Sequence, residues 1–182
     1  MIIVMGIPGA GKTTVLSEAL KGVQGWRIIN WGDRMVELAK AQGLVKDRDE
    51  MRKLPVEKQA KLQEDVADAL SKETGKWILD THCSINTPKG YFPGLPFRLL
   101  AKLHVDHLVL IEAPVENILR RRASDATRTR DTQPRALLEE QLFVNKSLIC
   151  AYSAFTGAPV SFIMNEDGKL SEAAASLRKL LE

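Results

Sequence analysis

The chain contains 182 residues, of which 45% are hydrophobic and 27% charged, as is typical of a globular protein with one sizeable core. No window approaches the roughly 18–20 apolar residues of a membrane-spanning helix, so the composition argues against an integral membrane protein. The formal net charge of +3 suits anionic substrates but is too small to indicate nucleic-acid binding. The two cysteines, Cys83 and Cys150, lie far apart, which predicts reduced, packed thiols rather than a metal or redox pair.

The first residues, MIIVM, are apolar, as they are in a secretory signal peptide. No basic stretch precedes Ile2, however, and a glycine-rich motif interrupts the apolar run after Met5. A signal peptide needs both a basic start and a longer apolar segment. We therefore expect a cytoplasmic protein.

Apolar runs rich in β-branched residues alternate with helical patterns along the whole chain. The predicted strands are Ile2–Met5, Arg27–Asn30, Trp77–Thr81, His107–Ile111 and Val160–Met164. The predicted helices start near Lys12 and Asp33, and cover Val56–Lys72, Val115–Ala123, Thr132–Phe155 and Glu172–Leu181. This alternation predicts an α/β fold with a five-stranded parallel sheet and helices on both faces. Ligands bind beyond the carboxyl ends of such strands, so the segments after Met5, Asn30, Asp80 and Ile111 are expected to form the site.

The strongest motif lies between the first strand and the first helix. Residues 6–13, GIPGAGKT, match G-x-x-x-x-G-K-[ST] at every fixed position. Glycines let successive backbone N–H groups point at phosphate oxygens, and the following helix adds its positive end. Lys12 is expected to contact the β- and γ-phosphates of a nucleoside triphosphate, and the Thr13 hydroxyl to bind Mg²⁺. An accidental glycine turn is the ordinary alternative, whereas a dinucleotide site is excluded because the spacing is not G-x-G-x-x-G.

A second candidate element is the short apolar run KWILD, which ends at Asp80. An acid at the end of a strand beside the phosphate loop is typical of a Walker-B carboxylate, which holds Mg²⁺ directly or through water. A strand-end cap or a surface acid is the alternative. His82 lies two residues further on and reaches the same edge of the sheet, either as a substrate contact or as a structural histidine.

Arginines, the residues best suited to bidentate phosphate contacts, cluster in two places. The clusters are residues 47–55 (DRDEMRKLP) and 120–131 (RRRASDATRTRD). Carboxylates are interleaved in both, so a solvated charged face is the ordinary interpretation. Two basic segments flanking a phosphate loop nevertheless favour phosphoryl transfer. One would grip the acceptor phosphate and the other would close over the transferring group and exclude water.

These stretches together resemble the adenylate kinases, specifically those of the archaeal type. The resemblance rests on residues 6–14, on NWGD at 30–33, on DRDEMRKLP at 47–55, on DTH at 80–82 with TPKGYFPGLP at 87–96, and on RTRD at 128–131. It implies a P-loop NTPase fold in a single domain over residues 1–182. A monophosphate-binding insertion would cover about 30–75 and a small lid about 120–135. Asn165 would stand where the last strand approaches the adenine.

The resemblance also implies a set of site residues. Those expected to bind the ATP phosphates are Gly6, Ile7, Pro8, Gly9, Ala10, Gly11, Lys12, Thr13 and Thr14, with Thr13 and Asp80 as Mg²⁺ ligands. Those expected to bind the acceptor AMP are Asn30, Asp33, Arg48, Arg52 and His82. The catalytic cations would be Lys12, Arg120, Arg128 and Arg130.

The chain departs from the larger bacterial-type enzymes in two places. Those enzymes carry an arginine where this chain has Val36 and Glu37, and another where it has Gly94. Arg48, Arg52 and Arg98 are the candidates to contact the AMP phosphate instead. No cysteine cluster is available for zinc, so a small lid is expected, and the archaeal resemblance implies a possible homotrimer.

The expected reaction is reversible transfer from MgATP to AMP, which yields two ADP, with neither nucleic acid nor membrane as a partner. Three alternatives stay open from the residues. The first is a kinase for another monophosphate, such as CMP or UMP. The second is a nucleotide-hydrolysing assembly factor or switch with a kinase-like fold. The third is a small-molecule kinase that acts on a hydroxyl group, for which Asp33 is the only suitable base.

Overall fold

The computed structural model of the chain describes residues 1–51, 53–124 and 134–182. The strands are β1 (Ile2–Met5), β2 (Trp26–Asn30), β3 (Lys76–Thr81), β4 (Ser84–Thr87), β5 (Gly90–Pro93), β6 (His107–Glu112) and β7 (Val160–Met164). The helices are α1 (Lys12–Ala19), α2 (Trp31–Ala41), α3 (Arg48–Met51), α4 (Val56–Leu70), α5 (Phe97–Leu100), α6 (Val115–Ser124), α7 (Arg135–Thr156) and α8 (Leu170–Arg178).

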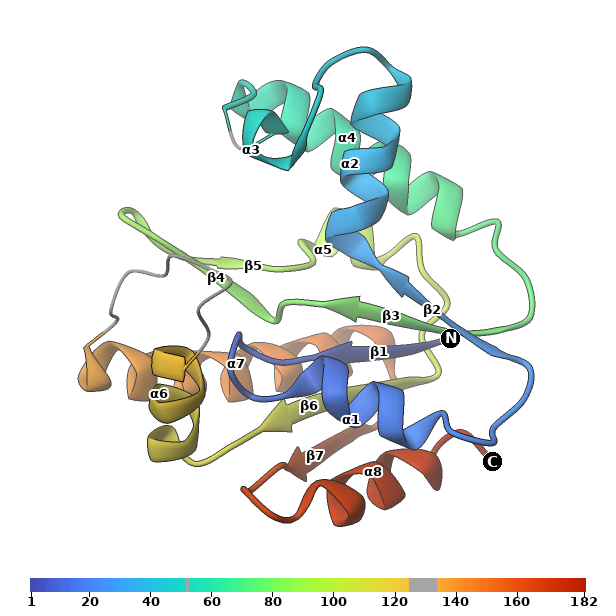
Figure 1. Cartoon of the computed structure of the whole chain (residues 1–182). Coiled ribbons are helices and arrows are strands. Elements are labelled where there is room, and N and C mark those ends of the chain that lie inside the picture. Colours follow the sequence, from blue (N-terminus) through green and yellow to red (C-terminus); the bar gives the residue numbers. More distant parts are fainter. Residues whose placement is uncertain (52, 125–133) are drawn as a thin grey trace.

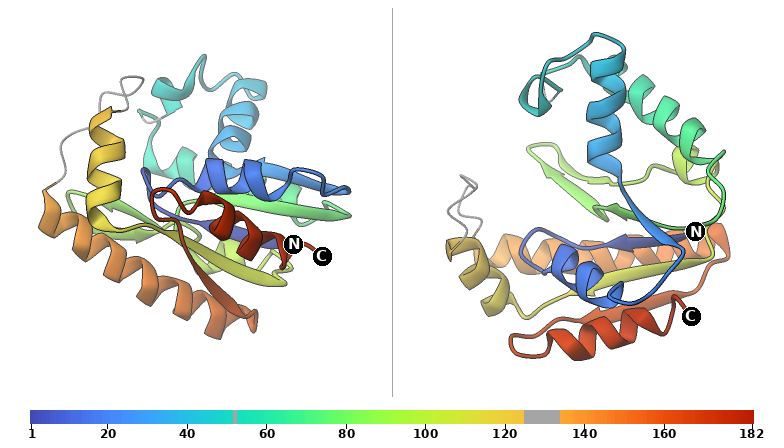
Figure 2. Two further views of the ribbon diagram at one scale, coloured as in Figure 1. Left: turned by 60° about the horizontal axis from the view of Figure 1, so that its bottom comes forward. Right: turned by 45° about the vertical axis from the view of Figure 1, so that its right-hand side comes forward.

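The core is a five-stranded parallel sheet in the order β2-β3-β1-β6-β7, with helices on both faces (Figures 1 and 2). The predicted fold class is therefore confirmed. Alternate residues of each strand point to opposite faces, so Ile3 and Met5 belong to one hydrophobic cluster and Ile2 and Val4 to the other. Burial on both faces explains why these strands read as nearly continuous apolar runs.

Different helices cover the two faces. The face of Ile3 packs against α2, α4, α5 and the C-terminal half of α7, through residues such as Leu62 and Ile149. The face of Ile2 packs against α1, α6 and α8, through residues such as Leu16 and Leu177. Figure 1 shows α2, α3 and α4 grouped together beyond the β2 edge of the sheet, between β2 and β3 in the chain.

All five predicted strands are present, and most helix boundaries differ from the prediction by only a few residues. Helix α2 begins at Trp31 rather than near Asp33, because Asn30 already caps it. Helix α7 begins at Arg135, directly after Pro134, whereas the prediction began it at Thr132, which lies outside the described residues. Of the described helices, none is both long and apolar enough to cross a membrane.

The antiparallel hairpin of β4 and β5 was not predicted. Its strands contain polar residues, glycine and proline, and Gly90 at its turn has a φ of 110°. Such a composition reads locally as a loop. One face of the hairpin is held by α7, because Ser84 Oγ donates a 2.6 Å hydrogen bond to Asn145 Oδ1.

The two cysteines behave differently. Cys83 is buried, as predicted, and burial raises the pKa of its thiol to about 12. Cys150 lies on the exposed face of α7, so the prediction of a packed thiol is wrong there. The helical stripe of α7 that faces the sheet includes Ile149, and the adjacent position points away from the core.

Candidate functional site

The phosphate loop connects β1 to α1, and three glycines allow it to fold tightly. Gly9 and Gly11 have φ angles of 94° and 85°, in the left-handed region that favours glycine. A Cβ on Gly11 would also overlap Asn165 Nδ2, and a Cβ on Gly6 would come within 2.8 Å of the Ile111 carbonyl oxygen. The fixed glycines of the motif are therefore required by φ or by close packing.

Lys12, the first residue of α1, reaches from this loop to the end of β3. Its Nζ donates a 3.0 Å hydrogen bond to the Thr81 carbonyl and forms an ion pair with Asp80. The side chains of Lys12 and Asp80 are only 11% and 10% exposed. Burial lowers the pKa of Lys12 to about 8. The two strongest candidates from the sequence thus meet at the carboxyl edge of the sheet, as expected of neighbouring parallel strands.

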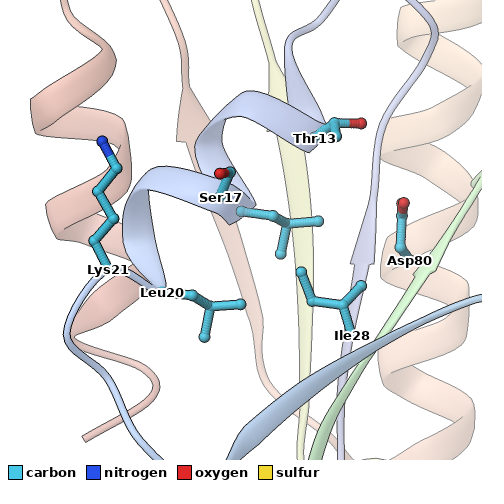
Figure 3. A pocket seen from close by; sticks show the side chains of 7 residues that line it. Thr13, Ser17, Leu20, Lys21, Ile28 and Asp80 are labelled. Carbon is cyan, nitrogen blue, oxygen red and sulfur yellow. The ribbon is translucent and has the colours of Figure 1, made fainter.

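Thr13 and Asp80 line one open pocket of about 430 Å³, together with side chains of α1 and β2. Figure 3 shows the Thr13 hydroxyl and the Asp80 carboxylate at one end of this pocket, with Leu20 and Lys21 in the turn after α1. Oδ2 of Asp80 accepts a hydrogen bond from Asn30, and the buried Oδ1 forms the ion pair with the Lys12 ammonium.

This pocket fits a magnesium ion that arrives with a nucleotide. In the described ranges, no three or more His, Cys, Asp or Glu side chains gather as a metal cluster. Mg²⁺ usually binds through one or two carboxylates and completes its shell with phosphate oxygens and water. The Asp80 carboxylate, whose Oδ1 pairs with Lys12 in this structure, and the hydroxyl of Thr13 supply such a sparse set of hard oxygen ligands.

The candidates for the acceptor side lie at the start of α2. Asn30 Oδ1 accepts a 3.0 Å hydrogen bond from the Asp33 backbone N–H and caps the helix. The Asp33 carboxylate forms a 2.6 Å ion pair with Arg48, the first residue of α3. A Cβ on Gly32 would come within 2.9 Å of the Arg48 guanidinium, so glycine leaves room for this pair. Asn30, Asp33 and Arg48 are thus brought together.

The other candidates fall in several places. His82 Nδ1 lies 3.4 Å from the Gly6 carbonyl oxygen, beside the phosphate loop. Arg120 is exposed on α6 and forms an ion pair with Asp167. Arg98, the proposed substitute for a missing arginine, is paired with Glu64 of α4 at 3.2 Å. The remaining three, Arg52, Arg128 and Arg130, lie outside the described residues.

The backbone explains one departure from the bacterial-type pattern. Gly94 N–H donates a 2.8 Å hydrogen bond to the Cys83 carbonyl, and a Cβ on Gly94 would overlap the His82 carbonyl oxygen. No arginine can occupy position 94 unless this backbone moves.

Two arginines that contact the phosphate loop were not among the predicted site residues. Arg121 Nη1 lies 3.2 Å from the Gly9 carbonyl oxygen, and Arg122 Nε donates a 2.9 Å hydrogen bond to the Pro8 carbonyl. Both belong to the run at 120–131 that the sequence singled out. Consecutive helical residues point about 100° apart, so the run alone does not tell which arginine faces the loop.

Comparisons with known proteins agree with this geometry. A family profile described as an AAA domain matches residues 5–138. The solved shikimate kinase from Acinetobacter baumannii, in complex with shikimate, superposes with a TM-score of 0.61 at 18% identity, covering 99% of this chain and 91% of that one. At such low identity this likeness concerns the fold alone.

Proteins related to this chain by sequence have a higher identity to it than this solved structure has. The adenylate kinase of Methanopyrus kandleri is 46% identical over 177 residues, which cover 95% of this chain and 93% of that protein. The adenylate kinase of Thermoplasma acidophilum is 42% identical over 98% of this chain and 97% of its own length. That of Methanothermobacter thermautotrophicus is 40% identical over 100% and 99%. With its phosphate loop, its Lys12–Asp80 pair and relatives matched over nearly their full length, the chain belongs to the adenylate kinases.

Proposed function

We propose that this protein catalyses reversible phosphoryl transfer from MgATP to AMP, which yields two molecules of ADP. One observation carries the proposal. The phosphate loop with its Lys12–Asp80 pair and the Asp33–Arg48 pair stand at the same carboxyl edge of the sheet, linked through Asn30. A triphosphate-binding loop beside a second cationic group is the arrangement that transfer between two nucleotides needs.

The donor nucleotide is assigned to the loop Gly6–Thr14. Its backbone N–H groups and the N-terminus of α1 would hold the phosphates, with Lys12 on the β- and γ-phosphate oxygens. Mg²⁺, held by Thr13 and Asp80, would neutralise negative charge on those phosphates as the bond breaks. Phosphate oxygens near Lys12 favour its charged form and offset the effect of burial on its pKa.

The acceptor is assigned to an insertion over about residues 30–75, which contains α2, α3 and α4. Arg48 would leave Asp33 to bind the AMP phosphate together with Arg52. Its present ion pair is 2.6 Å long but lies on the surface, where such a pair contributes little and is easily exchanged. Asp33 from α2 and His82 from the segment after β3 would also contact the AMP.

Chemistry at the transferring group is mostly positioning and charge stabilisation. An oxygen of the AMP phosphate attacks the γ-phosphorus while the bond to the β–γ bridging oxygen breaks, so no general base is needed. Lys12, Arg120, Arg128 and Arg130 would balance the charge that spreads over the transferring oxygens. Arg120 would exchange Asp167 for the phosphoryl group when the small lid at about 120–135 closes.

The reaction is tested with a coupled assay that measures ADP formed from ATP and a panel of acceptors. The panel contains AMP, CMP, UMP, shikimate as a hydroxyl acceptor, and no acceptor. ADP formed at two per AMP consumed, and only with AMP, supports the proposal. Equal or faster turnover with CMP or UMP indicates another monophosphate kinase, and ADP formed without any acceptor indicates a nucleotide hydrolase. Phosphorylation of shikimate points to a hydroxyl kinase, and each of these three outcomes contradicts the proposal.

The same proposal places the protein in the cytoplasm, with no nucleic-acid or membrane partner, as a possible homotrimer. Phe143 on α7 is 72% exposed, and Phe155 on α7 and Phe162 on β7 are about half exposed. Contact with another subunit would remove such apolar side chains from water. Light scattering coupled to size exclusion measures the mass against the 20.2 kDa of one chain.

A further inference from the structure

The carbonyl side of the phosphate loop carries a nearly complete set of hydrogen-bond partners. A loop whose amides converge on an anion turns its carbonyls to the opposite side, where they need donors. The donors within 3.5 Å are His82 for Gly6, Ala10 N–H for Ile7, Arg122 for Pro8, Arg121 for Gly9, and Arg121 with Asn165 for Ala10. Four of these five consecutive carbonyls, all except that of Ile7, are thus contacted by side chains from outside the loop.

Arg121 is the centre of this set. Its Nη1 lies 3.2 Å from the Gly9 carbonyl oxygen and 3.3 Å from that of Ala10. Its Nη2 lies 3.0 Å from the Asn165 carbonyl oxygen and 2.5 Å from Asp167 Oδ1, and its Nε lies 2.9 Å from the same Oδ1. A guanidinium group has five N–H donors, and these contacts use all five. Arg121 therefore has no donor left for a nucleotide phosphate.

The burial and the charge partner of Arg121 suit a residue that holds the phosphate loop in place. The Arg121 side chain is 25% exposed, and the Asp167 carboxylate balances its charge. Asn165 closes the same structure, since its buried Nδ2 donates a 2.8 Å hydrogen bond to the Ala10 carbonyl. Arg121 thus joins the loop after β1, whose Gly9 lies 112 positions earlier in the sequence, to the turn after β7.

We propose that Arg121 is a positioning residue, which acts through the carbonyls of Gly9 and Ala10 to hold the phosphate loop in its binding conformation. The proposal rests on the function proposed above, because it concerns the donor site of that reaction. Arg121 lowers the cost of ordering the loop when a nucleotide binds, as preorganisation does generally. A lysine has one compact ammonium group and cannot span two loop carbonyls, the Asn165 carbonyl and Asp167 together.

The test compares Arg121→Ala and Arg121→Lys with the wild type and with Arg178→Ala. Arg178 is a matched control, because it also donates to three backbone carbonyls of the same helix region, those of Glu18, Ala19 and Lys21. Those carbonyls lie at the opposite end of α1 from the phosphate loop. Calorimetry gives Kd for MgADP and for AMP alone, steady-state kinetics give KM for ATP and AMP, and thermal unfolding without nucleotide checks the fold.

We expect Arg121→Ala to weaken MgADP binding and raise KM for ATP by about 10- to 100-fold, since charged hydrogen bonds to two half-buried carbonyls are lost. Arg121→Lys should fall between this variant and the wild type. Kd and KM for AMP should stay within about twofold in both, because the contacts of Arg121 are with the phosphate loop and the turn after β7. Every nucleotide constant of Arg178→Ala should also stay within about twofold, because its contacts lie at the far end of α1.

Two results overturn the positioning role. The first is MgADP affinity in both Arg121 variants equal to that of the wild type. The second is a loss of MgADP and AMP affinity in equal proportion, which indicates a general loss of structure. If Arg121→Ala does not fold, Arg121→Lys decides, because it keeps a charged partner for Asp167. A wild-type protein that fails to bind MgADP overturns the proposed function itself, and this role with it.

Discussion

Nδ2 of Asn30 donates a hydrogen bond of 2.9 Å to Oδ2 of Asp80, across two neighbouring strands whose register places these residues side by side. The same Asn30 caps α2 through its Oδ1. One amide therefore joins the carboxylate assigned to Mg²⁺ to the first helix of the acceptor insertion. It also orients the carboxylate so that Oδ1, the oxygen paired with Lys12, faces the phosphate loop.

The Asn30–Asp80 contact makes a prediction about metal affinity. Asn30→Ala should weaken MgADP binding by about tenfold or more, because partners that orient a metal ligand typically matter by that amount. ADP binding in EDTA should change little. Calorimetry with and without Mg²⁺ measures both.

Asp47→Ala is the control for the loss of a helix cap. Asp47 Oδ1 accepts hydrogen bonds of 2.9 Å from the N–H groups of Asp49 and Glu50 and caps α3, in the same insertion. Both variants should lose about 1 kcal/mol of stability, as cap deletions do. The prediction fails if the ratio of MgADP affinity to ADP affinity is the same in Asn30→Ala as in the wild type.

The buried ammonium of Lys12 predicts a large catalytic effect. Lys12→Ala should lower kcat by about 10³-fold or more, in line with other cations that stabilise phosphoryl transfer. Lys21→Ala is the control, because Lys21 lies in the same pocket but pairs with Glu18 on the surface. Turnover by Lys12→Ala near that of the parent, in a coupled assay, would refute the role given to the loop.

The lowered pKa of Lys12 predicts how nucleotide binding depends on pH. Burial lowers this pKa to about 8, so below that pH the free protein already carries the ammonium. Above it, the amine must take up a proton when phosphates bind, because they favour the charged form. Kd for MgADP should therefore rise by up to about tenfold per pH unit above this pKa, until the pKa of the complex is reached.

Calorimetry between pH 7 and 10, in buffers with different ionisation enthalpies, measures both the affinity and the proton uptake. AMP binding should show no such uptake, because an arginine stays charged throughout this range. A Kd for MgADP that is constant from pH 7 to pH 10 would rule out a titrating Lys12.

The tight backbone at Gly94 predicts that this position tolerates no side chain. A Cβ there overlaps the His82 carbonyl oxygen, so Gly94→Ala should destabilise the protein by about 1–3 kcal/mol, as overpacking does. Gly94→Arg should be at least as destabilising and should not improve AMP binding. Chemical denaturation measures the change. An unchanged unfolding midpoint in Gly94→Ala would show that the backbone relaxes freely at this position.

Local patterns in the sequence predicted much of the fold and the meeting of the phosphate loop with Asp80. The apolar runs of the five parallel strands, the motif at residues 6–13 and the acid at the end of KWILD were all readable, and the structure brings Lys12 and Asp80 together as expected. The hairpin of β4 and β5 was not predicted from the sequence. Its stability comes from α7 through contacts such as Ser84 to Asn145, and not from its own propensity.

What the amino-acid sequence determined by itself was therefore the five parallel strands, most of the helices between them and the phosphate loop, since periodicity and short motifs are properties of neighbouring residues. Only the tertiary structure decided that Asn30 bonds to Asp80, that Asp33 meets Arg48, and that Arg121, rather than Arg120, holds the loop. The physical reason is that these contacts join residues 15 to 112 positions apart. Whether two such side chains meet depends on strand register and on the rotation of a helix about its axis. Local sequence patterns specify neither of these.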